Sequence, residues 1–185
     1  QISDLGKYIK KNFGRLDILV NNAGITLSDS SLDYSEKFWD KTNDVNIKAP
    51  FFLSQECAKI MKLKKSGIII NITSINAEFA FPDNPSYQVS KAGLKQLTKS
   101  LSLDLAKFGI RVNSVGPGYF HTMMTNKSWD NIKRRKLITN NTILGRWGEP
   151  KDLEGVIIFL ASDASSYITG QNIYIDGGWS VKGIK

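Results

Sequence analysis

Cysteine and histidine are almost absent from this sequence. Cys57 is the only cysteine, so no disulfide can form within the chain, and a reducing compartment fits that composition. His121 is the only histidine, and one histidine with one cysteine gives no reason to expect a metal site. No apolar run approaches the ~18 residues that span a bilayer, and no signal peptide is visible. We therefore expect a soluble, cytoplasmic chain with no metal ion and no membrane contact.

Acidic residues are the minority among the charged ones, with 17 Asp and Glu against 25 Lys and Arg and a formal net charge of +8. A basic chain can bind nucleic acid non-specifically, and a steep salt dependence of DNA binding would identify such a protein. The basic residues are scattered, however, apart from one cluster between residues 118 and 150. Solvated basic faces explain this pattern, so we expect no nucleic-acid partner.

The apolar pattern alternates between amphipathic helices and short strands. Ile2, Leu5, Ile9 and Phe13 recur at helical spacing and stop at Gly14, which predicts a first helix. Such alternation, with continuous apolar strands, predicts an α/β fold with a Rossmann-like, doubly wound parallel sheet covered on both faces. The predicted strands are 16–20, 68–72, 111–115 and 172–176, and further apolar stripes predict helices over 94–108 and at Val156, Phe159 and Leu160.

Three polar side chains carry the candidate chemistry. Tyr87 and Lys91 are four residues apart at the start of a predicted helix, which places them on one face. A phenol with a pKa near ~10 is a poor base, and a neighbouring ammonium group lowers that pKa. Ser74 follows a predicted strand, at the edge of the sheet where ligands of α/β proteins bind. Taken alone, the Tyr–Lys pair is weak evidence, because such a pair is much more often a tyrosine that packs on an aliphatic lysine stem.

The pair does not stand alone, because the whole sequence resembles the short-chain dehydrogenase/reductase family. The resemblance implies an NAD(P)-dependent oxidoreductase that interconverts an alcohol and a carbonyl. Its motifs occur in the family order: NNAG at 21–24, Asn46, Ser74, YxxxK at 87–91, Asn113, Pro117, Gly118, Thr122 and DGG at 176–178.

The resemblance implies a role for each matching residue. Tyr87 would be the general acid and base, and Lys91 would lower its pKa and hold the cofactor ribose. Ser74 would hydrogen-bond the reacting oxygen, and Asn46 would support a chain of water molecules that relays protons to Lys91. The implied contacts to NAD or NADP come from Asn22, Ala23, Gly24, Tyr87, Lys91, Pro117, Gly118, Phe120 and Thr122.

Asn46 lies in a predicted helical stretch, four residues before Pro50. Proline has no N–H to bond the carbonyl of the residue four positions earlier, so the Asn46 carbonyl would be left to bind a water molecule. The alternative is that Pro50 simply begins the next helical segment, where proline is tolerated.

The glycine-rich TGxxxGxG turn of the family, which holds the cofactor pyrophosphate, does not occur in this sequence. We therefore expect residues 1–185 to be the C-terminal part of one such domain, N-terminally truncated, with the strand at 16–20 as an unpaired edge. Alone, it would contact only the nicotinamide riboside end of the cofactor and bind it weakly. The alternative, of another class, is a non-catalytic remnant that acts only by association.

Residues 118–150 correspond to the family's substrate lid. A basic cluster here could bind an anionic substrate such as a sugar acid, or an acidic carrier, although a solvated helix face explains it equally. The cluster comprises Lys127, Lys133, Arg134, Arg135, Lys136 and Arg146, and the candidate substrate contacts are Ser74, Tyr119, His121, Arg146 and Trp147.

Three local motifs resemble the gluconate 5-dehydrogenase and 2-deoxygluconate 3-dehydrogenase branch of the family. They are PGYF at 117–120, GRWGEP at 145–150 and DGGW at 176–179. The 3-oxoacyl-carrier-protein reductases share the same core and are the alternative. The family resemblance also implies a homodimer or homotetramer, built on the helices at 35–63 and after Tyr87.

Overall fold

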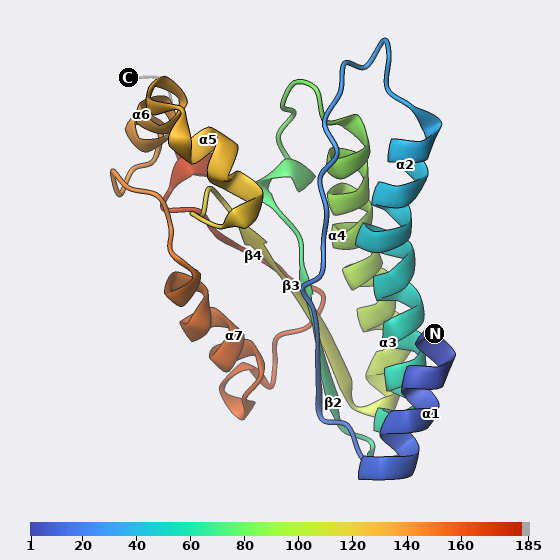
Figure 1. Cartoon of the computed structure of the whole chain (residues 1–185). Helices are drawn as coiled ribbons and strands as arrows, with labels where there is room; N and C mark the ends of the chain where they lie inside the picture. Colours follow the sequence, from blue (N-terminus) through green and yellow to red (C-terminus); the bar gives the residue numbers. More distant parts are fainter. Residues whose placement is uncertain (183–185) are drawn as a thin grey trace.

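The computed structural model describes residues 1–182, so the last three residues of the predicted domain, 183–185, lie outside it. Its centre is a single four-stranded sheet in which all neighbouring strands are parallel, in the order β1-β2-β3-β4 (Figure 1). Each strand begins and ends within two residues of its predicted position, which confirms the α/β fold. The strands are β1 (Ile18–Asn21), β2 (Gly67–Ile72), β3 (Ile110–Pro117) and β4 (Asn172–Ile175).

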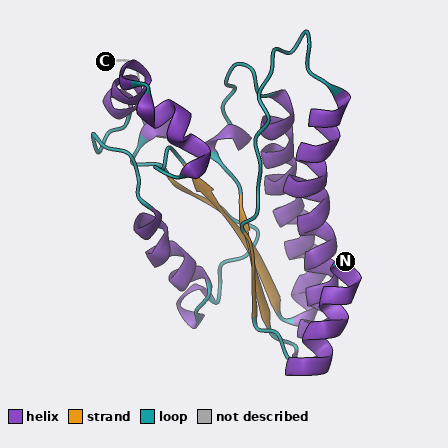
Figure 2. Ribbon diagram, viewed as in Figure 1, coloured by secondary structure: helices purple, strands orange, loops and turns teal. Residues whose placement is uncertain are grey.

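Helices connect and flank the strands, as Figure 2 shows. A π-helical turn (Asp44–Lys48) joins α2 to α3, so the helix predicted from residue 35 onward is one nearly continuous rod. None of the described helices is long and apolar enough to cross a membrane. The helices are α1 (Ile2–Phe13), α2 (Glu36–Asn43), α3 (Ala49–Met61), α4 (Pro85–Leu105), α5 (Asn126–Asp130), α6 (Ile132–Asn141) and α7 (Glu154–Leu160).

The two faces of the sheet are covered by different helices. Helices α3 and α4 cover one face, where Met61 and Leu101 pack against Ile69 and Val112. Helix α7 covers the other face, where Leu160 packs against Ile70 and Val115. The buried stripe of α7 differs from the prediction in one position. Phe159 is 37% exposed, because α7 turns Val156, Ile157 and Leu160 toward the sheet instead.

Strand β1 forms one edge of the sheet and pairs with β2 alone among the described strands. Leu19 points into the core beside α3, whereas Ile18 and Val20 are 41% and 39% exposed. The expectation of an apolar edge at this strand is therefore confirmed.

Buried amides connect this edge to the interior. The side chain of Asn21 donates to Asn71 Oδ1 at 2.8 Å, and Asn71 donates to Thr98 Oγ1 of α4 at 2.9 Å. Since a buried amide without a partner costs free energy, this chain of bonds favours one register of β1 on β2. The same register brings the carboxyl ends of the parallel strands to one edge of the sheet, where the candidate residues lie.

Two glycines with left-handed backbone give a matched test of the packing behind the sheet. Gly14 ends α1 at φ 66° with open space around it, whereas a Cβ on Gly109, at φ 68°, would lie 2.1 Å from the Lys65 carbonyl oxygen. We expect Gly14→Ala to lower the free energy of unfolding by about 1 kcal/mol, the left-handed penalty alone. Gly109→Ala should cost about 3 kcal/mol, because a backbone clash is added. Urea unfolding of both variants checks this, and equal losses would contradict it.

Candidate active site

A cleft of about 680 Å³ opens at the carboxyl ends of the strands. Its walls come from the loops after β1, β2 and β3, from the start of α4, and from the segment that carries α5 and α6 (Figure 1). The strand ends supply backbone and small side chains, while α4 supplies the larger polar groups. The residues named below as cleft residues all belong to this lining.

Tyr87 and Lys91 lie one turn apart on α4 and both line the cleft. The Lys91 side chain is buried, and its Nζ donates to the Ile72 carbonyl at 2.7 Å and lies 5.6 Å from the centroid of the Tyr87 ring. Helix α4 therefore places the ammonium group beside the phenol, at the end of β2. The predicted spacing on one face is confirmed.

Ser74 faces the same cleft from the end of β2. Its Oγ accepts a hydrogen bond of 3.1 Å from the Asn76 backbone N–H, which caps a short 3-10 turn (Ile75–Ala77). This bond uses an acceptor site of the hydroxyl and leaves its proton free to donate. Ser74 can thus offer a hydrogen bond to an oxygen in the cleft.

Burial controls the ionisation of the pair. It raises the pKa of Tyr87, and the nearby Ser74 hydroxyl lowers that pKa by a smaller amount. It also lowers the pKa of Lys91 from 10.5 to about 8, because the charged form loses its hydration. The net effect of the surroundings is to raise the pKa of Tyr87, and a lowering of that pKa by Lys91 stays a prediction.

Asn46 is fully buried in the π-helical turn and does not line the cleft. Its amide accepts from the Ile25 N–H and donates to the Ile25 carbonyl, both at 2.9 Å, and also donates to Ser90 Oγ at 3.1 Å. A Cβ placed on Gly24 would lie 3.5 Å from both Asn46 Oδ1 and Lys91 Nζ. Asn46 thus holds the loop after β1 against α4.

The backbone at Asn46 fits both interpretations of Pro50. Pro50 does begin α3, in its first turn. The turn before it is widened, so that the Ala49 N–H donates to the Asp44 carbonyl five residues earlier. Sequence reasoning placed a disturbance of the helix here but could not assign its form.

The structure brings all nine predicted cofactor contacts to the lining of the cleft. They arrive from different loops, since 22–24 follows β1 and 117–122 follows β3. Asn113 does not join them. It is fully buried and bonds the Ile168 carbonyl and the Gln171 N–H, so its part in the family motif is structural here. The nine residues are Asn22, Ala23, Gly24, Tyr87, Lys91, Pro117, Gly118, Phe120 and Thr122.

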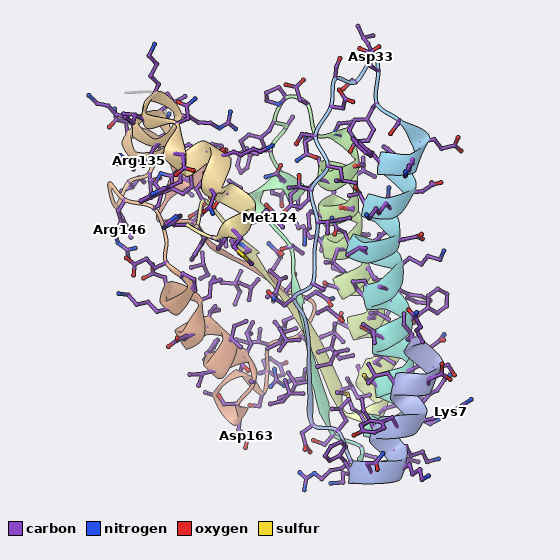
Figure 3. The ribbon with its side chains drawn as sticks, in the orientation of Figure 1. Lys7, Asp33, Met124, Arg135, Arg146 and Asp163 are labelled. Atoms are coloured by element: carbon purple, nitrogen blue, oxygen red, sulfur yellow. The ribbon has the colours of Figure 1, made fainter. Side chains whose placement is uncertain are left out.

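The predicted substrate contacts divide into two groups. Ser74 and Tyr119 line the cleft, whereas His121, Arg146 and Trp147 do not. His121 stacks on an indole ring 4.2 Å away. Arg146, which is labelled in Figure 3, makes two hydrogen bonds of 2.7 and 2.9 Å to the Asp152 carboxylate. His121, Arg146 and Trp147 brace the segment 118–152, because their polar or aromatic groups are occupied by Trp129, Asp152 and Tyr119, respectively.

Sequence reasoning missed Phe81 as part of the cleft wall. Phe81 lines the cleft together with the predicted Tyr119, and both rings pack around Trp179, at centroid distances of 5.5 and 5.9 Å from that ring. Arg134, at the start of α6, is the single member of the basic cluster that lines the cleft. The cluster itself was visible in the sequence, but its one cleft-facing member was not.

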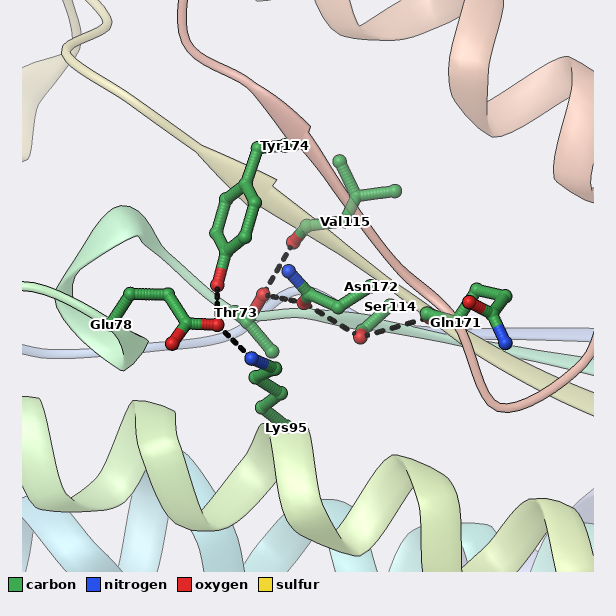
Figure 4. A network of polar contacts seen from close by, with 8 residues as sticks. All are labelled: Thr73, Glu78, Lys95, Ser114, Val115, Gln171, Asn172 and Tyr174. Carbon is green, nitrogen blue, oxygen red and sulfur yellow. Dashed lines mark hydrogen bonds and ion pairs between the residues drawn. The ribbon is translucent and has the colours of Figure 1, made fainter. Parts of the chain in front are cut away.

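A polar network stands behind Ser74, at the junction of β2, β3 and β4 (Figure 4). Thr73 Oγ1 bonds the Val115 carbonyl at 3.0 Å and Asn172 Oδ1 at 2.6 Å, and Ser114 donates to the same Asn172 oxygen. These bonds fix the backbone next to Ser74. In the described part of the chain no group of three or more His, Cys, Asp and Glu side chains could hold a metal ion.

Comparison with known proteins agrees with this geometry. A family model described as enoyl-(acyl carrier protein) reductase, of the short-chain dehydrogenase/reductase type, matches residues 1–180. The 2-dehydro-3-deoxy-D-gluconate 5-dehydrogenase of Dickeya dadantii is 43% identical over 168 residues, which is 90% of this chain and 66% of that protein. The 3-oxoacyl-[acyl-carrier-protein] reductase of Thermotoga maritima is 40% identical over 178 residues, 96% of this chain and 72% of that protein.

Solved structures show the same likeness. A gluconate 5-dehydrogenase from Burkholderia cenocepacia, in complex with NADP and tartrate, superposes with a TM-score of 0.97 at 34% identity, over 99% of this chain and 72% of that one. The chain spans about two thirds of the length of the curated relatives it matches.

The burial of Lys91 predicts a pH-dependent stability. Below pH 8 Lys91 is charged in the folded and unfolded states, and burial of the charge costs free energy. Between pH 8 and 10.5 the folded state releases its proton first, so this cost disappears. The free energy of unfolding should then rise relative to that of Lys91→Met, by up to about 3 kcal/mol. Urea titrations across this range measure it, with exposed Lys99→Met as the matched control. A pH-independent difference would contradict the assignment.

Proposed function

Because the chain belongs to the short-chain dehydrogenase/reductase family, we propose that its protein is an NAD(P)-dependent oxidoreductase that interconverts an alcohol and a carbonyl on a sugar acid or related carbohydrate. The observation that carries this proposal is the meeting of Tyr87, Lys91 and Ser74 in one cleft at the carboxyl ends of parallel strands. The names of the Dickeya and Burkholderia relatives support the sugar acid, and the tartrate in the latter is itself a carboxylated polyol.

In this proposal Tyr87 moves the proton. Its raised pKa keeps the phenol protonated at neutral pH, which suits donation to a carbonyl oxygen during reduction. The free proton of Ser74 hydrogen-bonds the same oxygen and stabilises the charge that develops there. Lys91, with a pKa of about 8, exchanges protons near neutral pH and lies beside the phenol. Asn46 holds the loop after β1 and bonds Ser90, the residue before Lys91, and its role in a water chain stays a prediction.

The cleft also suits the nicotinamide end of a cofactor. NAD or NADP, when bound, supplies the acceptor or donor of the hydride. Residues 22–24, with Pro117, Gly118 and Thr122, would hold it through backbone and small polar groups. Gly24 leaves the space beside Lys91 Nζ open, which suits a ribose hydroxyl as the lysine's partner. These residues do not distinguish NAD from NADP.

Reduction of a 3-oxoacyl group on a carrier protein is the second candidate function. The relative from Thermotoga maritima favours it, and so does the exposed basic face of α6, which suits an acidic carrier. An association role without catalysis is the third, from a different class. Activity assays distinguish the three candidate functions: turnover of a sugar acid supports the first, turnover of a 3-oxoacyl substrate supports the second, and turnover of neither supports the third.

Tyr87→Phe tests the proposed chemistry directly. The variant keeps the ring but loses the proton that Tyr87 transfers, so kcat should fall at least about a hundredfold while cofactor binding is retained. The measurement is initial-rate kinetics together with cofactor titration, on the protein that carries this chain. Tyr167→Phe is the matched control, because Tyr167 is fully exposed and should leave kcat unchanged. Near-normal turnover of Tyr87→Phe would reject the assignment.

We also propose that the protein is a cytoplasmic homodimer or homotetramer. Phe52 on α3 and Val89 on α4 support this, since they are 41% and 50% exposed on the helices expected to meet a symmetry mate. Sedimentation at micromolar concentration should show a dimer or a larger species, and Phe52→Asp should shift it toward monomer. Phe13→Asp, at a phenylalanine of α1 that is 65% exposed, is the control. A wild-type monomer would contradict the proposal.

A further inference from the structure

The charges that line the cleft are all of one sign. Among the described residues that form its walls there is no aspartate or glutamate, and the cationic side chains are Lys91 and Arg134. Lys91 lies at the end of β2, buried and bonded to the Ile72 carbonyl. Arg134 lies on the lid side, in the first turn of α6. A cleft with this composition favours an anionic ligand.

The other basic side chains near the lid have different surroundings. Arg146 is held by Asp152, and Lys151 pairs with Glu149 at 2.9 Å. The guanidinium of Arg135 lies 5.0 Å from the centroid of the Trp129 ring and stacks over it. The remaining lysines at 127, 133 and 136 are exposed and line no part of the cleft. Of these basic side chains, Arg134 is the one that lines the cleft, and its guanidinium forms no ion pair with any described residue.

Tyr119 supplies a second hydrogen-bond donor in the cleft that Arg134 lines. The Tyr119 side chain lines the cleft, and its hydroxyl makes no hydrogen bond to any described residue. The Tyr119 ring is held in place by Trp147 and Trp179, at 5.5 and 5.9 Å between centroids. A fixed phenol and a guanidinium that line the same cleft are a suitable pair of donors for a carboxylate.

We infer that Arg134 binds the carboxylate of the substrate, with the Tyr119 hydroxyl as a second donor. This inference rests on the proposed sugar-acid oxidoreductase and adds the residue that recognises the acid. Helices α6 and α4 lie on opposite sides of the strand ends (Figure 1), and they bring Arg134 and Tyr87, respectively, to the cleft wall. A substrate whose carboxylate is bound at α6 therefore presents one particular hydroxyl to Tyr87, namely one at a fixed number of carbons from the carboxylate. Arg134 determines specificity in this arrangement, and Arg146 braces the lid.

The experiment compares charge-matched substitutions on one helix. The variants are Arg134→Ala, Arg134→Lys and Lys136→Ala in the protein that carries this chain, with cofactor present. The Asn131 cap bonds the backbone N–H of residue 134, so removal of the arginine side chain leaves the start of α6 intact. Isothermal titration gives the dissociation constants of D-gluconate and of D-glucitol, an uncharged polyol of the same length. Steady-state kinetics give KM for D-gluconate and for the cofactor.

Arg134→Ala should raise the dissociation constant and KM of D-gluconate by about tenfold to a hundredfold, the usual effect of losing a charged hydrogen bond. The values for D-glucitol and for the cofactor should stay within about twofold. Arg134→Lys should fall between wild type and alanine, because a lysine keeps the charge but not the planar pair of donors. Lys136→Ala should behave as wild type.

Three outcomes would overturn the inference. The first is that D-gluconate fails to bind the wild type or binds Arg134→Ala with unchanged affinity. Either result means that the guanidinium anchors no sugar acid. A raised KM for the cofactor instead assigns Arg134 to the cofactor phosphates. An equal effect of Lys136→Ala indicates diffuse charge rather than a contact. Arg134-dependent binding of D-gluconate without turnover would support the anchor while rejecting the proposed function, so the two failures are distinguishable.

Discussion

The buried ammonium group of Lys91 is the interaction around which the rest of the site is arranged. It is buried between α4 and the end of β2, where its charge is costly, and its bond to the Ile72 carbonyl offsets only part of that cost. That bond requires α4 to start at the carboxyl end of β2. It thereby places Tyr87 over the cleft and next to Ser74. The lowered pKa of Lys91 is the direct result, and it keeps a proton near neutrality where the site can use it.

Buried polar side chains keep this arrangement in register. Hydrogen bonds of the Asn21 and Asn71 side-chain amides connect β1 to β2 and α4. Asn46 holds the loop after β1 through the backbone N–H and carbonyl of Ile25. Thr73 and its partners fix the far end of β2. Each of these groups would lose a partner if a strand slipped by one residue, so the register and the position of the cleft are determined together.

The predicted lid is built differently, from aromatic rings and ion pairs. Trp147 is buried between Tyr119 and Trp129, and Arg146 closes the base of the segment on Asp152. Such rings supply large apolar contacts at low cost in side-chain entropy, which suits a wall that must stay open to a polar ligand. Basic side chains are left on α6 around this framework. Only the one at residue 134 reaches the cleft.

The sequence by itself determined the α/β order of strands and helices and the pair Tyr87 and Lys91. Both follow from short-range rules, namely apolar periodicity and the four-residue spacing of a helix face. It also indicated Ser74 and the nine cofactor residues, through motifs whose spacing matches a known family. Only the tertiary structure decided the direction of the Tyr87 pKa, the structural place of Asn113, and the choice of Arg134 over Arg146 as the cleft's lid cation. These depend on burial and on partners distant in the chain, such as Ile168 for Asn113, and spacing along a sequence does not contain them.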